Sequence, residues 1–137
     1  MALSAVLEFG NNDVKRYTKR YLVSDCRFLF SRPYNGFSPS GAPRCERIEL
    51  TIVAPGKDDL ELVKWFAEQD VQSGRIVIGL PGDNNWESSD TQILYFDSAK
   101  CFSLSEVYDV DSSRRRLLKL ATGPEHLEID GITFKRA

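Results

Sequence analysis

The chain is poor in histidine and cysteine, two residue types that many catalytic and metal sites use. Its 137 residues include a single histidine, His126, and three cysteines that are far apart and form no Cys-x-x-Cys arrangement. We therefore expect neither a disulfide framework nor a structural zinc site. Any catalytic unit with a histidine base would have to use His126.

Signatures of cofactor binding are missing as well. No glycine-rich phosphate loop or dinucleotide fingerprint is present. Residues 36–40 resemble part of a nucleophile elbow but lack its final glycine. The acidic stretch from Asp83 to Asp90 lacks the central glycine and the last glutamate of a calcium loop. We expect no cofactor or metal, and an enzyme is the weaker hypothesis.

Long apolar runs and an excess of one charge are also absent. No run approaches the roughly 18 residues of a membrane helix, and no basic segment typical of a cleavable signal peptide stands near Met1. We expect a chain made in the cytoplasm. The net charge of −2 favours neither a nucleic acid nor an anionic membrane as partner.

One basic cluster departs from this balance. Two tyrosines alternate with it, and its members are Lys15, Arg16, Tyr17, Lys19, Arg20 and Tyr21. Such a pattern could bind a nucleic acid, but a solvated strand face explains it more simply.

Short alternating segments dominate the sequence, and together they predict one domain over residues 1–137. The predicted strands are 2–9, 14–31, 48–53, 75–80, 92–97, 99–110, 117–121 and a terminal hairpin at 127–134 around Asp130-Gly131. On the second strand we expect Leu22, Cys26, Phe28 and Phe30 to point inward, whereas alternation predicts that Cys45 points outward.

The only convincing helix is predicted at about residues 58–71. Asp58 can cap its start, Glu61 occupies the capping-box position, and Gly74 can stop it. Its apolar side is about half the circumference, wider than one contact needs, and consists of Leu60, Leu62, Val63, Phe66 and Ala67 with Trp65 at the border. We expect this helix to flank a small antiparallel β-barrel or two-sheet sandwich of about eight short strands.

Residues 32–43 form the least regular segment, and their three prolines and two glycines predict that it contains neither helix nor strand pairing. A loop of this length in a small domain is usually functional or disordered. Tyr34 and Phe37 favour function, because exposed aromatic side chains need a cover.

The order of these segments resembles a known family. The residues that carry the resemblance are Phe28-Leu-Phe-Ser31, Ile48-Glu-Leu-Thr-Ile52, Leu62-Val-Lys-Trp65-Phe66, Ser73-Gly-Arg-Ile76, Leu94 to Cys101 and Ile129-Asp-Gly-Ile132. This succession resembles the haemolysin-coregulated protein Hcp (TssD), the tube protein of type VI secretion, most closely its Bacteroidetes form.

The resemblance implies a structural subunit without enzymatic activity that closes into a hexameric ring. Rings stack into a tube, which a contracting sheath expels together with a VgrG-like spike and with effectors in the lumen. The protein would then be cytoplasmic before firing and secreted afterwards without a cleavable signal. Our candidates for self-assembly contacts are Arg32, Tyr34, Asn35, Phe37, Arg44, Arg47 and Trp65.

Two other readings are kept. One is a related phage-tail-tube subunit, which would share the physics of assembly. The other is a barrel that binds a small apolar ligand and therefore has an internal cavity, although the bulky residues Phe28, Phe30, Leu50 and Phe96 favour a filled interior.

Overall fold

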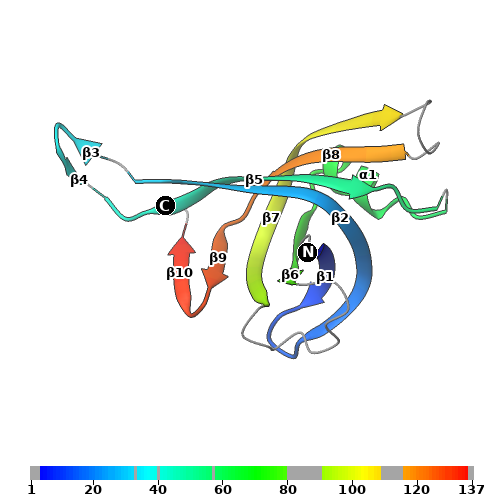
Figure 1. Cartoon of the computed structure of the whole chain (residues 1–137), viewed down its shortest axis with the longest axis horizontal. Helices are drawn as coiled ribbons and strands as arrows, with labels where there is room; N and C mark the ends of the chain where they lie inside the picture. The colour runs from blue at the N-terminus through cyan, green and yellow to red at the C-terminus, as the bar shows by residue number, and fades with distance from the viewer. Residues whose placement is uncertain are drawn as a thin grey trace.

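The structure is a computed structural model that describes residues 4–32, 34–39, 41–56, 58–79, 91–108 and 116–135. The described part is mainly β, as predicted (Figure 1). Its elements are β1 Ser4–Asn11, β2 Arg16–Ser31, β3 Tyr34–Asn35, β4 Ser38–Pro39, β5 Arg44–Val53, α1 Glu61–Ala67, β6 Val71–Gly79, β7 Gln92–Tyr108, β8 Arg116–Gly123, β9 His126–Ile129 and β10 Ile132–Lys135. No helix within these ranges is long and apolar enough to cross a bilayer.

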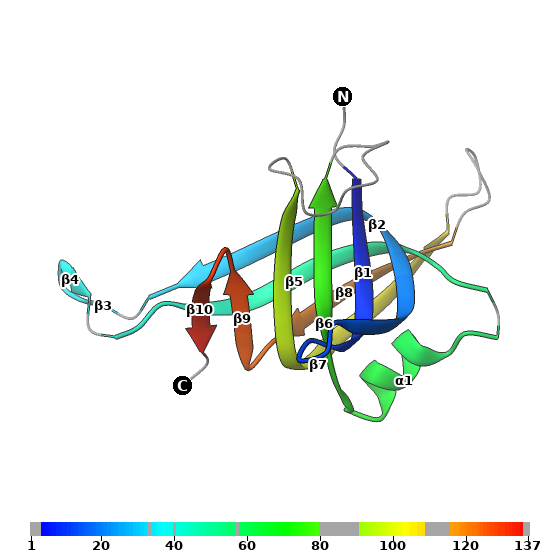
Figure 2. The same ribbon diagram turned by 90° about the horizontal axis from the view of Figure 1, so that it is seen from below.

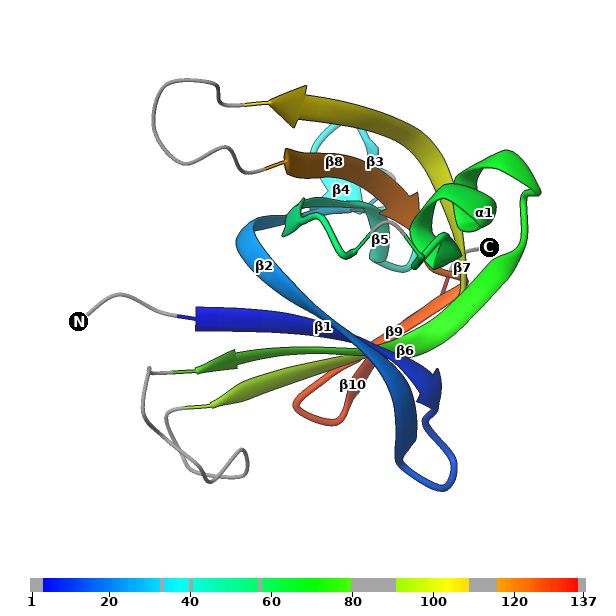
Figure 3. The ribbon, with the colours of Figure 1, turned by 90° about the vertical axis from the view of Figure 1, so that its right-hand side faces the viewer.

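Six strands close into an antiparallel barrel in the order β7-β6-β1-β2-β5-β8, because β8 pairs with β7 as well as with β5. The 16-residue β2 and the 17-residue β7 belong to both sides of the barrel. β2 pairs with β1 as far as Val23 and with β5 from there on. Figure 3 shows β2 curving from the β1–β6 side to the β5–β8 side.

β-bulges lie where the two long strands change sides. The register of β2 shifts between Val23 and Asp25, and that of β7 shifts between Cys101 and Ser103. A bulge bends its strand and increases the local twist, so it allows one strand to turn a corner of a small barrel. The segments predicted at 92–97 and 99–110 are therefore one strand, with Ser98 at a φ of 52°.

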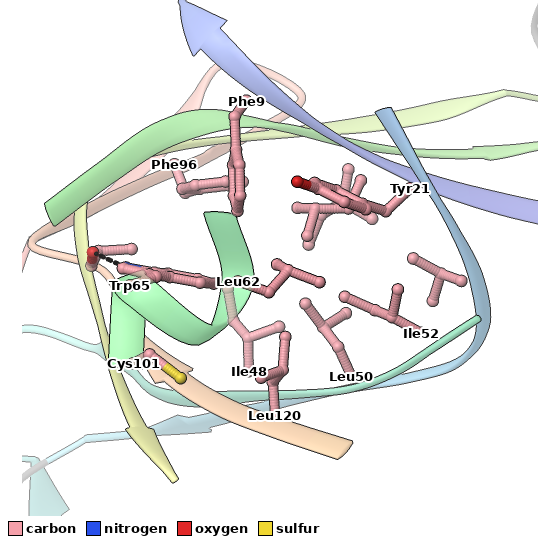
Figure 4. Packing of buried hydrophobic residues seen from close by; sticks show 14 of the residues in the cluster. Phe9, Tyr21, Ile48, Leu50, Ile52, Leu62, Trp65, Phe96, Cys101 and Leu120 are labelled. Carbon is pink, nitrogen blue, oxygen red and sulfur yellow. Dashed lines mark hydrogen bonds between the residues drawn. The ribbon is translucent and has the colours of Figure 1, made fainter. Parts of the chain in front are cut away.

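The barrel interior is filled by apolar side chains (Figure 4). The Phe9 ring lies edge-on to Trp65, Tyr21 and Phe96, with centroid distances of 5.2, 5.6 and 6.4 Å. Leucine and isoleucine side chains from the surrounding strands complete this core, among them Leu7, Ile48, Leu50, Ile52, Ile76, Leu94, Leu118 and Leu127. This packing is consistent with the filled interior predicted from the sequence.

The helix α1 is confirmed, but it is shorter than predicted. It contains seven residues, and Asp58 provides no side-chain cap. Asp59 has that role instead, because its carboxylate accepts a hydrogen bond of 3.1 Å from the backbone N–H of Glu61. The helix ends at Ala67, and two residues later Gln69 has a φ of 54°.

Gly74 does not stop the helix, because it lies within β6. A Cβ atom at this position would be 1.9 Å from the backbone oxygen of Glu8 in the neighbouring β1. Glycine is therefore required for close approach of two strands.

Two residues lie on the opposite face of their strand from the one predicted, and in both cases the reason is a shift of the strand register. Leu22 is 60% exposed while its neighbours Tyr21 and Val23 are buried, because the bulge after Val23 inverts the alternation. Cys45 is buried rather than outward, because a second bulge, between Leu29 and Phe30 in the register with β5, places it on the same face as Ile48.

The predicted terminal hairpin is confirmed. Ile132 pairs with Ile129, and the turn residues Asp130 and Gly131 have φ values of 52° and 82°. Positive φ at both positions is the conformation that an Asp-Gly hairpin turn favours. The predicted acidic loop at Asp83 to Asp90 lies outside the described residues.

Candidate assembly surface

A two-stranded arm extends from the barrel and is the most distinctive feature of the surface (Figures 1 and 2). Ile48 is the first residue of β5 with a partner in β8, so β5 residues 44–47 pair only with β2. We call residues 29–47 the arm. Its far end is the small β3–β4 hairpin, in which Tyr34 pairs with Pro39 and Asn35 with Ser38. The prediction that residues 32–43 contain no strand pairing is therefore wrong.

Side chains from both strands brace the arm near its base. The Glu46 carboxylate accepts hydrogen bonds from the hydroxyl of Ser31 and, at 2.7 Å, from Nε of Arg44. Arg32 donates from its Nε to the backbone oxygen of Gly41 at 2.9 Å. The Ser31–Glu46 and Arg32–Gly41 contacts cross the arm and limit how far its two sides can separate, whereas the Arg44–Glu46 contact lies within β5.

The C-terminal hairpin supports the arm from below. The rings of Phe30 in β2 and Phe134 in β10 have centroids 4.9 Å apart. Phe30 is nevertheless 43% exposed, which differs from its predicted inward position. The barrel core thus ends at the base of the arm.

Phe37 is at the tip of the arm. Its side chain is fully exposed, and it follows Gly36, whose φ of 65° makes the turn between β3 and β4. A phenylalanine in this position contributes nothing to the core of its own subunit. An exposed ring on a braced arm is typical of a contact with another molecule.

The other predicted contact residues are distributed unevenly. Arg32 and Arg44 lie on the arm, where both take part in the bracing contacts. Arg47 is exposed and forms an ion pair with Glu49 at 3.1 Å, on the outward face of β5. The described backbone places Tyr34 and Asn35 in β3.

Trp65 lies in the core instead of on the surface. Its side chain is 1% exposed, and its Nε1 donates a 2.9 Å hydrogen bond to the backbone oxygen of Ala99 in β7. Trp65 therefore holds α1 against the barrel and is not available for a surface contact. Helical spacing could not reveal this, because Trp65 stands at the border of the predicted apolar side.

Part of the apolar side of α1 is exposed. The sequence predicted this side to be wider than one contact needs, but it did not show what lies beside it. Leu62 and Trp65 are buried, whereas Leu60, Val63 and Phe66 are between 36% and 54% exposed. Beside them a groove is lined by Phe66, Ala67, Gln69, Lys100, Cys101 and Phe102. We call it the α1–β7 groove.

A second, polar groove lies on the outward face of β2, β5, β8 and β7. Charged side chains of both signs line it, including Asp25, Arg27, Arg47, Glu49 and Lys119. This face offers hydrogen bonds and balanced charge instead of apolar area.

Electrostatics hold α1 in place. Burial opposes ionisation of Asp59, but hydrogen bonds from the Glu61 amide, Lys19 and Tyr21 outweigh it and keep the pKa of this carboxyl below its usual value. Lys19 is 3.4 Å from the carboxylate. Burial, together with the Asp59 charge, raises the pKa of the Tyr21 hydroxyl. The hydroxyl therefore stays protonated and can donate to Asp59.

These contacts also weaken the nucleic-acid reading of the basic cluster. Tyr21 is 3% exposed, so it cannot stack on a base. The ring of Tyr17 is covered by the guanidinium of Arg75, whose Cζ is 4.2 Å from the ring centroid. Lys19 is paired with Asp59, and Lys15 lies over the ring of Tyr95. The cluster is largely engaged within its own subunit.

The described residues also contain few catalytic arrangements. Within these ranges no three His, Cys, Asp or Glu side chains come together as metal ligands would. Burial raises the pKa of the Cys101 thiol to about 11, so this thiol stays protonated. His126 is exposed on β9, paired in register with Asp97 of β7.

The comparison with protein families agrees with this structure. The family model described as "Hemolysin coregulated protein Hcp (TssD)" matches residues 1–137, the whole chain. The chain belongs to the Hcp family. It is a structural tube protein of type VI secretion, as the order of its segments predicted.

Solved structures show how far the Hcp fold is retained. Hcp1 from Flavobacterium johnsoniae has a TM-score of 0.73 at 16% identity, with 99% of this chain and 100% of that chain covered. Hcp1 from Salmonella typhimurium has a TM-score of 0.68 at 12% identity, with coverages of 98% and 92%. At such identities the likeness establishes the fold alone.

A contractile injection system contains a similar fold. A chain of the anti-feeding prophage baseplate, solved by cryo-EM with sixfold symmetry, has a TM-score of 0.56 at 13% identity, with coverages of 96% and 95%. The comparison with curated proteins finds no match.

Proposed function

We propose that six copies of this Hcp protein close into a ring and that the rings stack into a tube expelled by a contractile sheath. The observation that carries the proposal is the braced arm with the fully exposed Phe37 at its tip, on a chain that matches the family over its whole length. The arm reaches a neighbouring subunit or ring and sets the stacking through Tyr34, Asn35 and Phe37.

Ring formation needs two different contact surfaces on each subunit, because in a closed ring one surface of each subunit binds the other surface of the next. Apolar side chains are exposed in separate places on this subunit. Val63 and Phe66 lie on α1 and Leu60 directly before it, Phe37 lies at the arm tip, and Ile132 lies on β10. This distribution supports a head-to-tail assembly better than a two-fold dimer.

The remaining parts of the proposal concern partners and location. A VgrG-like spike would occupy the tip of the tube, the sheath would surround it, and effectors would occupy its lumen. The protein would remain in the cytoplasm until firing and leave the cell as part of the expelled tube.

The role is structural instead of catalytic. The family supports this role, and the scarcity of histidine and the protonated thiol at Cys101 are consistent with it. A phage-tail-tube subunit would have the same assembly, so only its genomic neighbours would separate the two. A ligand-binding barrel is disfavoured by the core around Phe9.

The first experiment is native mass spectrometry of the purified protein, with negative-stain images of the same sample. We expect hexamers and ring-shaped particles. The double variant Tyr34→Ser/Phe37→Ser should remain folded, because the exposed Phe37 adds nothing to the core, and its assembly should be weaker. The control is Val14→Ser, which removes another accessible apolar side chain, 60% exposed, from the β1–β2 turn.

Two outcomes would count against the proposal. A clean monomer of the unmodified protein at high concentration would contradict unaided ring formation. Normal assembly of the Tyr34/Phe37 double variant would show that the arm tip is not needed for assembly, and the proposal that six copies form a ring would still hold.

A further inference from the structure

The α1–β7 groove has exposed aromatic side chains in its lining. Phe66 of α1 and Phe102 of β7, which are 39% and 48% exposed, line it together with Ala67 and the buried Cys101. Gln69 and Lys100 complete the lining. Two aromatic side chains together with small and soft ones suit a ring that packs edge-to-face or offset.

Lys100 adds a preference for an aromatic occupant over an aliphatic one. Its side chain is exposed, so its ammonium group can lie over the face of a ring held in the groove. The polar groove on the outward face of β5 differs, because charged side chains such as Arg27, Glu49 and Lys119 line it. Of these two grooves, only the α1–β7 groove suits an apolar ring.

The arm tip carries an aromatic side chain that its own subunit does not cover. Phe37 is fully exposed, and it is carried on a hairpin braced by Glu46 and Arg32. Because the brace limits the freedom of the hairpin, less conformational entropy is lost when the tip binds.

The tip and the groove cannot meet within one subunit. β3 and β4 lie toward one end of the longest axis of the molecule, and α1 lies toward the other (Figures 1 and 2). A contact between them must therefore join two copies, and the pair then still offers one free tip, on the copy whose groove is filled, and one free groove, on the other. Such a contact is heterologous and repeats from subunit to subunit.

We propose that Phe37 of one copy inserts between Phe66 and Phe102 of the next copy. This inference rests on the proposed tube function and names the receiving surface for the arm. The occupant is a second copy of this chain, and the contact passes from subunit to subunit in one direction. Loss of the Phe37 side chain, or of both Phe66 and Phe102, weakens association of the subunits by about tenfold or more, as for a central aromatic contact.

Disulfide cross-linking tests this contact directly. The variant Phe37→Cys/Gln69→Cys places one thiol at the tip and another in the groove, on an exposed side chain. Two native cysteines are replaced in all samples: Cys26 by serine, because it is not fully buried, and Cys101 by alanine, because it lines the groove and could itself react with the tip. Mild oxidation should give a ladder of dimers, trimers and larger species. The matched control, Phe37→Cys/Glu128→Cys, has its second thiol on β9 and should give no ladder.

The outcomes separate this inference from the proposed function. A ladder from the Phe37→Cys/Gln69→Cys variant and none from the control supports the contact. Adding Phe66→Ser/Phe102→Ser to the first variant should abolish the ladder. Absence of a ladder, an equal ladder in the control, or a cross-link within one chain overturns it. Native mass spectrometry of the unmodified protein reports ring formation separately. Hexamers without the cross-link would refute the groove and leave the tube function standing.

Discussion

At Gly74, the distance between two strand backbones explains the choice of amino acid. The neighbouring backbone oxygen of Glu8 occupies the place where a Cβ atom would lie. Gly56 makes a useful contrast, because a Cβ there would have no atom within 4 Å. The same residue type is thus required at one position and replaceable at the other.

We predict that Gly74→Ala lowers the free energy of unfolding by about 2 kcal/mol or more, because β1 and β6 must move apart. Gly56→Ala should change it by no more than about 0.5 kcal/mol. Urea denaturation followed by circular dichroism measures both values. Equal stabilities of the two variants would show that the strands do not approach each other so closely.

At the level of the element, α1 is a seven-residue helix held by contacts outside itself. So short a helix has little stability of its own. Trp65 ties it to β7, and Asp59 ties its beginning to Lys19 and Tyr21 of β2. The position of the α1–β7 groove therefore depends on a few polar contacts.

We predict that Asp59→Asn destabilises the protein by about 1 kcal/mol near pH 7, since hydrogen bonds to a charged group are lost. The folded pKa of Asp59 is lowered, so its contribution is complete above the ordinary aspartate pKa of about 3.9. It is lost as the pH falls through the lower folded value. The difference in unfolding free energy between the two proteins should therefore shrink in acid.

Denaturation midpoints at several pH values between neutral and strongly acidic conditions measure this difference. Asp58→Asn is the matched control, because Asp58 is exposed and makes no cap to α1. A constant difference at all pH values would contradict the role of the Asp59 charge.

For the whole molecule, the closed barrel and the arm differ in how much structure surrounds them. Strands β1 and β6 have a partner on each side, whereas the arm is a ribbon whose β5 strand pairs only with β2. Opening of the arm exposes little apolar surface, so it costs less free energy than opening of the barrel.

We predict that amides of residues 34–39 exchange with solvent faster than those of β1 and β6 in the dissociated subunit. Exchange of residues 34–39 and of 66–69 should slow together on assembly, because tip and groove cover each other. Hydrogen exchange with mass spectrometry of dissociated and assembled samples tests this. Protection of only one of the two segments would contradict their pairing.

Local pattern was sufficient for much of this protein. Alternation predicted most strands, the Asp-Gly dipeptide predicted the last hairpin, and apolar spacing predicted the helix. The irregular composition of residues 32–43 also predicted an exposed Phe37, which is confirmed, whereas its contact with another subunit stays a prediction. These features depend on residues close together in the chain, so the order of the chain already contains them.

Tertiary structure decided the faces and the ends. Leu22 points outward and Cys45 inward because bulges against neighbouring strands shift the register. α1 stops at Ala67, and the following chain joins β1 as β6. The α1–β7 groove likewise exists only where α1 meets β7, and two residues of its lining, Phe66 and Phe102, are far apart in the sequence. Such features depend on which distant strand becomes the neighbour, and local periodicity contains no information about that.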